Sequence, residues 1–68
     1  MHAIDEAFVR KVMDQLPGVP EPRIVVRMFD DPSTSEREAK QVAEFIREPV
    51  AIVSRDGKLL AYYIPVAN

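Results

Sequence analysis

The stretch VAIVSRDGKLLAYYIPV, residues 50–66, constrains the fold of this 68-residue chain more than any other. Asp56-Gly57 separates two apolar runs, which is the strongest short-range signal of a β-hairpin. With Asp56 and Gly57 as the two turn residues, strict pairing gives Arg55–Lys58, Ser54–Leu59, Val53–Leu60, Ile52–Ala61, Ala51–Tyr62 and Val50–Tyr63.

Both faces of this hairpin are apolar. Alternation along the strands places Val53, Ala51, Leu60, Tyr62 and Ile64 on one face, and Ile52, Val50, Leu59, Ala61 and Tyr63 on the other. A ribbon of this kind needs cover on both sides. One face can pack on helices, and the other needs either the first strand with the N-terminal helix or a second chain. The candidates for a dimer or partner interface are Ile52, Leu59, Tyr62 and Tyr63.

The remaining residues supply two helices and one strand. Residues 3–16 carry apolar side chains at helical spacing, so they predict an amphipathic helix. The connector PGVPEP at 17–22 ends it. RIVVRMF at 23–29 predicts a strand with Ile24, Val26 and Met28 on its core face.

The second helix begins at Asp31-Pro32, an N-cap followed by proline, and ends before Pro49. Its apolar stripe consists of Ala39, Val42, Ala43 and Ile46, with Phe45 off the centre. The predicted order is therefore α-β-α-β-β in a single domain spanning 1–68. We expect an α+β fold in which the C-terminal hairpin packs on two helices, with one parallel strand pairing possible.

Composition argues against catalysis and against a cofactor. The chain has no cysteine and one histidine, His2, so neither a nucleophilic triad nor a metal cluster can be built from these residue types. Its two glycines are isolated, which excludes a phosphate-binding loop. We therefore predict no catalytic residue, no metal, no cofactor and no small-molecule substrate.

The charge balance and the apolar runs limit the partners and the location. Nine basic and eleven acidic residues give a net charge of −2, which disfavours a strong nonspecific polyanion binder. No apolar run approaches the ~20 residues of a membrane span. The N-terminal residues lack the pattern of a signal peptide. A cytoplasmic protein without a membrane partner is expected.

Three pairs of basic residues are candidate contacts. Arg55 and Lys58 stand at the hairpin tip, and Arg37 and Lys40 stand on the second helix, where glutamates are interleaved with them. These four residues could meet nucleic acid or an acidic partner, or simply keep the surface solvated. Arg23 and Arg27 form a second basic face on the first strand.

The C-terminal part of the chain resembles the Phd/YefM family of antitoxins. That family has a short strand, a helix opening with Ser-Glu, and a hairpin of the form pvaItrrGkpvAvlvp. Here the sequence SEREAKQVAEFIREPVAIVSRDGKLLAYYIPV matches in order at Pro49-Val50, Ile52, Arg55, Gly57-Lys58 and Ala61. The resemblance covers about residues 24–66 and implies a Phd-like β-α-β-β core at 23–66.

The resemblance also implies a function. Family members form dimers that bind operator DNA and repress their own operon, and a C-terminal tail neutralises a toxin. This sequence departs from the family in having an additional N-terminal helix, a shorter segment between helix and hairpin, and no tail after Asn68.

Two functions are therefore carried forward. The first is a non-catalytic regulatory protein, a dimeric DNA-binding antitoxin or autorepressor that uses Arg37, Lys40, Arg55 and Lys58. The second is a small inhibitor encoded by a mobile element or phage, of the anti-CRISPR type, that binds a host protein. Both predict a homodimer.

Overall fold

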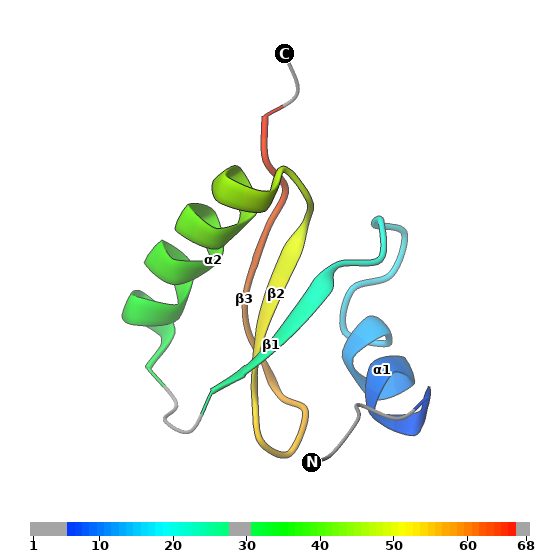
Figure 1. The fold of residues 1–68 in the computed structure, drawn as a ribbon. Coiled ribbons are helices and arrows are strands. Elements are labelled where there is room, and N and C mark those ends of the chain that lie inside the picture. Colours follow the sequence, from blue (N-terminus) through cyan, green and yellow to red (C-terminus); the bar gives the residue numbers. More distant parts are fainter. Residues whose placement is uncertain (1–5, 28–30, 67–68) are drawn as a thin grey trace.

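The computed structural model describes residues 6–27 and 31–66 and confirms the α+β class and the predicted order of elements (Figure 1). The elements are α1 (Glu6–Met13), β1 (Arg23–Arg27), α2 (Pro32–Ile46), β2 (Val50–Ser54) and β3 (Leu59–Tyr63). The three strands form one sheet in the order β1-β2-β3. β1 runs parallel to β2, and β3 runs antiparallel to it, so the sheet is mixed.

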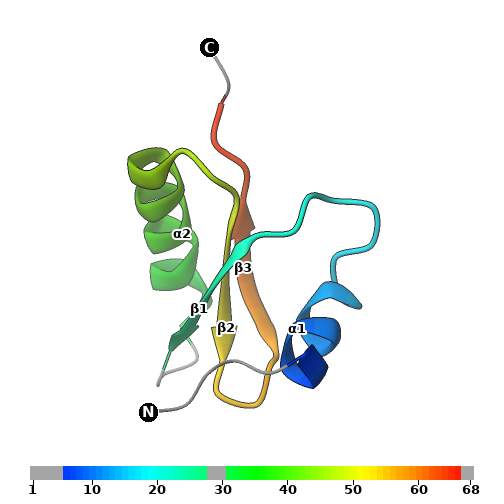
Figure 2. The ribbon, with the colours of Figure 1, turned by 45° about the vertical axis from the view of Figure 1, so that its right-hand side comes forward.

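The two helices cover opposite faces of this sheet, with the strands between them (Figure 2). The central strand β2 is buried along its whole length. The α2 side holds Ala39, Ala43, Val50, Ile52 and Ala61, with Val25, Val42, Ile46, Leu60 and Tyr63 packed against them. The α1 side holds Val12, Leu16, Ala51 and Val53, with Phe8, Val19, Ile24, Leu59 and Tyr62 packed against them. The N-terminal helix is thus the cover of the second apolar face.

The hairpin register agrees with the prediction at its open end and departs from it near the tip. Val50–Tyr63, Ala51–Tyr62 and Ile52–Ala61 pair as expected, but Val53 pairs with Leu59 instead of Leu60, because an irregularity falls between Ile52 and Val53. The extra residue in β3 behaves as a β-bulge. As a result Leu59 packs on the α1 side and Leu60 on the α2 side, the reverse of what strict alternation predicted.

The prediction for the core face of β1 is confirmed for Ile24 and wrong for Val26. Both neighbours in the strand contribute to packing, Ile24 on the α1 side and Val25 on the α2 side, whereas Val26 is 43% exposed. The reason is that the sheet is covered on both faces, so one-sided alternation does not apply. Met28 and Phe29, predicted to continue the strand, lie outside the described residues.

Local signals explain the helix ends. The N-cap of α2 is Asp31, whose carboxylate accepts bonds from the Thr34 N–H and hydroxyl, at 3.5 and 2.7 Å. α2 closes at Arg47, which adopts a left-handed φ of 62° and donates its N–H to Ala43 O. α1 ends at Met13, three residues before the predicted end, in i→i+3 turns that precede Pro17.

Candidate functional site

The tip of the hairpin is organised by the buried side chain of Ser54. The Ser54 main chain closes the turn: its O accepts from Gly57 N at 3.0 Å and its N donates to Lys58 O at 2.8 Å. The Ser54 hydroxyl donates to Asp56 Oδ1 at 2.5 Å and accepts from Lys58 N at 3.0 Å. The predicted turn pair Asp56-Gly57 does lie in the turn, but Arg55 and Lys58 are not a closing pair. Both are exposed.

The Asp56 carboxylate is held in its ionised form at this tip. The Ser54 hydroxyl bond is the largest cause that lowers the pKa of Asp56, followed by a backbone N–H bond and by the charges of Lys11 and Lys58, while burial opposes them. Asp56 is therefore an internal acceptor of the turn as well as a surface charge.

A third cation joins the tip from the N-terminal helix. A Cβ at Gly57 would lie 3.0 Å from Lys11 Cδ and 3.5 Å from a ring carbon of Phe8, so the stem of Lys11 lies across this glycine. Lys11 and Lys58 lie close enough for their charges to act on Asp56, and Arg55 is the exposed residue before Asp56 in the same turn. Counted with the Asp56 carboxylate, three cations less one anion give the tip a local charge of +2. Sequence reasoning missed Lys11, because nothing local links it to a turn that follows it by more than forty residues.

Gln15 fixes α1 to the hairpin. Its amide donates to Gly57 O at 2.7 Å and its Oε1 accepts from Leu59 N at 2.9 Å, so one side chain pairs with two main-chain groups at the start of β3. The same amide also donates to Lys11 O at 3.1 Å. Sequence reasoning missed this residue too, because a glutamine after a helix carries no signal of a distant partner. These bonds hold α1, which carries Lys11, against the hairpin tip.

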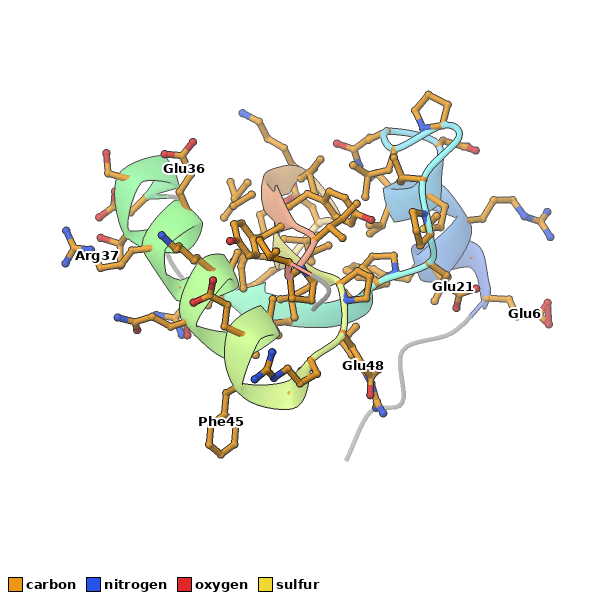
Figure 3. All side chains as sticks on the ribbon, turned by 90° about the horizontal axis from the view of Figure 1, so that it is seen from above. Glu6, Glu21, Glu36, Arg37, Phe45 and Glu48 are labelled. Atoms are coloured by element: carbon orange, nitrogen blue, oxygen red, sulfur yellow. The ribbon has the colours of Figure 1, made fainter. Side chains whose placement is uncertain are left out.

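The other two predicted DNA-contacting residues stand elsewhere. Arg37 and Lys40 are exposed on α2, and Arg37 projects outward, away from the sheet (Figure 3). Glu36 lies beside Arg37 on the same helix (Figure 3). The fold therefore separates the predicted set into a cationic hairpin tip and a mixed-charge helix surface.

The predicted second basic face on β1 is neutralised. Arg23 Nε lies 2.9 Å from Glu48 Oε1, and Arg27 Nη1 lies 2.9 Å from Glu38 Oε2. The hydrogen bond and charge of Glu48 raise the pKa of Arg23, and Arg23 lowers the pKa of Glu48 in turn. The Arg23–Glu48 pair is exposed and contributes little to stability. Because each arginine is paired with a glutamate, the β1 edge carries both signs of charge and is not a basic face.

The four predicted interface residues all take part in contacts within the chain. Ile52 is fully buried on the α2 side, and Leu59 and Tyr62 pack on the α1 side. The Tyr62 hydroxyl donates to Pro20 O at 3.0 Å, and burial raises its pKa. The Tyr63 hydroxyl donates to Glu44 Oε2 at 3.1 Å, and this bond is the main cause that raises the pKa of Tyr63.

A shallow, open hollow is lined by Glu6, Val9 and Arg10 of α1 and by Glu21 of the connector. Two of these residues, Glu6 and Glu21, are labelled in Figure 3. Within residues 6–27 and 31–66 no three His, Cys, Asp or Glu side chains are grouped so as to hold a metal ion. No helix in the same part of the chain is long and apolar enough to cross a membrane.

Comparisons of this chain with family models, with curated proteins and with solved structures found no match.

Proposed function

We propose that this chain is a small, non-catalytic regulatory binding protein of the cytoplasm that contacts nucleic acid phosphates through its hairpin tip. The observation that carries this proposal is the approach of Lys11 to a turn that already carries Arg55 and Lys58. Gln15 and Ser54 hold that turn in one geometry, so the charges are presented by a rigid base. The resemblance of residues 24–66 to DNA-binding antitoxins supports the same class.

A salt titration tests the proposal. A labelled duplex from the protein's own promoter should bind at low salt, and log K should fall with log salt at a slope of about −2.7 per chain if three phosphates are neutralised. Lys58→Gln or Lys11→Gln should reduce that slope by about one.

The matched control is Arg10→Gln. Arg10 precedes Lys11 on α1 but lines the hollow beside Glu21, so its loss should leave the slope unchanged. The pair Arg37→Gln and Lys40→Gln tests the α2 surface in the same way. A slope that responds to the α2 pair and ignores Lys11 and Lys58 would refute a role for the tip.

A second candidate is the inhibitor that binds a host protein. The mixed charge of α2 favours it, because Arg37 and Lys40 stand beside glutamates instead of forming a continuous basic strip. No binding to duplex DNA at about 50 mM salt, where phosphate contacts are strong, would favour this candidate over the first.

A further inference from the structure

Strand β1 lies at one edge of the sheet. In the parallel ladder Arg23 N donates to Pro49 O at 2.8 Å, so the main-chain groups of Arg23, Val25 and Arg27 face β2. The N–H and C=O groups of Ile24 and Val26 consequently point to the open side. Among the described residues no strand pairs with this side of β1. An exposed edge of this kind is a template for pairing with another strand.

The edge carries an exposed apolar side chain on the α1 side of the sheet. Val26 is 43% exposed on the α1 side of the strand, next to Ile24. Phe45 of α2 is 87% exposed. It projects toward the side of the molecule on which Glu48 and β1 lie (Figure 3). A strand added to this edge would remove part of the Val26 side chain from water.

The charges at the edge are balanced and suit a second copy. Arg23 with Glu48 marks one end of β1, and Arg27 with Glu38 marks the other. Each end is neutral overall and contains one charge of each sign. In an antiparallel approach of two copies about Val25, Arg23 of one copy stands opposite Arg27 of the other. Each arginine keeps its own glutamate beside it, so these ends meet without net charge. Each end therefore brings one cation and one anion to a two-fold interface, in which the same surface of both copies meets itself.

We propose that the β1 edge pairs antiparallel with β1 of a second copy and joins the two three-stranded sheets into one. The two-fold axis passes at Val25. The N–H and C=O groups of Ile24 then pair with those of Val26 of the second copy. By symmetry, Val26 pairs in the same way with Ile24 of the second copy. This interface differs from the hairpin face from which a dimer was predicted, because α1 covers that face. It does not depend on what the hairpin tip binds.

Sedimentation equilibrium of wild type, Val26→Lys and Ile64→Lys tests the interface. Ile64 is 47% exposed, close to the 43% of Val26, but follows β3, so its variant is a matched control for loss of an exposed apolar side chain. Val26→Lys places a charge opposite Ile24 of the second copy. It should raise the dimer dissociation constant by at least about tenfold, while Ile64→Lys leaves the constant within about twofold.

A cysteine scan tests the register. The chain has no cysteine of its own, so Val25→Cys supplies a single thiol. At the proposed axis residue 25 faces itself in a non-hydrogen-bonded pair, with Cα atoms ~4.5 Å apart, within the range of a disulfide. Mild oxidation should convert Val25→Cys into a covalent dimer, and Ile64→Cys should cross-link far more slowly.

Three outcomes would overturn the inference. They are a wild-type monomer at about 100 μM, equal weakening by Val26→Lys and Ile64→Lys, or equal cross-linking of the two cysteine variants. A monomer that still shows the salt slope at the tip would leave the proposed function standing. A dimer without that slope would support the interface and contradict the proposed function.

Discussion

The two faces of the sheet are held by different means. On the α2 side, Ala39 and Ala43 bring the helix close to β2, and short connections at both ends of α2 join it to β1 and β2. On the α1 side, the helix reaches the hairpin through Gln15, and its connector reaches β3 through the bond from Tyr62 to Pro20 O. One face is thus fixed by chain connectivity and packing, and the other by packing together with a few polar bonds between distant residues. We therefore expect α1 to open at a lower free energy than the β-α-β-β core.

The largest effect is expected from truncating the core on each side. Ile52→Ala removes a fully buried side chain from the α2 side and should lower the free energy of unfolding by about 3 kcal/mol. Val12→Ala on the α1 side should cost about 2 kcal/mol, from two lost methyl groups and the cavity they leave. Urea unfolding measures both.

Hydrogen exchange shows whether the two losses are local. Val12→Ala should speed exchange of α1 amides while the β2 amides stay protected, whereas Ile52→Ala should speed exchange in every element. If both variants speed exchange uniformly, the two faces form one cooperative unit and the comparison fails.

The Gln15 clamp provides the next largest effect. Gln15→Leu keeps the bulk of the side chain but leaves Gly57 O and Leu59 N without this partner, so it should cost about 1–2 kcal/mol. The Leu59 amide should also lose protection from exchange. Gln41→Leu, on the exposed surface of α2, is the control and should be close to neutral. Equal stability of the two variants would show that the clamp does not hold α1.

Two glycines have positive φ, but only one of them lies against α1. Substituting each by alanine therefore distinguishes the cost of a left-handed backbone from the cost of contact with α1. Gly18 has φ of +77° and open space around it, whereas Gly57 has φ of +89° and lies under Lys11 and Phe8. Gly18→Ala should cost about 1 kcal/mol from the left-handed backbone alone. Gly57→Ala should cost slightly more, since only the flexible stem of Lys11 has to move. The informative readout is the salt slope of DNA binding, which Gly57→Ala should lower and Gly18→Ala should not.

Local sequence signals predicted the elements well because each depends on neighbouring residues. Asp31-Pro32 defined the start of α2, and Pro49 lay just beyond its end. The apolar excess of the hairpin correctly indicated cover on both faces, and α1 supplies the second cover.

Long-range geometry was not predictable in the same way. The bulge that moves Leu60 to the α2 side has no sequence signal in the apolar pair Leu59-Leu60. The pairing of Arg23 and Arg27 with glutamates depends on where α2 lies over β1, which spacing does not reveal. The same limit hid Lys11 and Gln15, whose roles arise only when α1 meets the hairpin tip.

The smallest expected effect is the dependence of stability on pH. It arises at two sites, the hairpin tip next to α1 and the start of α2. The pKa of Asp56 is lowered at the hairpin tip, chiefly by Ser54, and the pKa of Asp31 is lowered at the start of α2, chiefly by Thr34. A carboxyl whose pKa is lowered on folding stabilises the fold above its ordinary titration range. That stability is lost as the pH falls below about 4.

Asp56→Asn and Asp31→Asn should each make the acid loss of stability shallower, as measured by thermal unfolding between pH 6 and pH 2. Salt then distinguishes the two sites, because at 1 M the Debye length is only about 3 Å. Charges are the smallest of the causes at both sites, but two of them, Lys11 and Lys58, act on Asp56, whereas only Arg37 acts on Asp31. High salt should therefore reduce the effect of Asp56→Asn more than that of Asp31→Asn. An equal response to salt would show that Lys11 does not act on the tip, and would remove the electrostatic part of the contact between α1 and the hairpin.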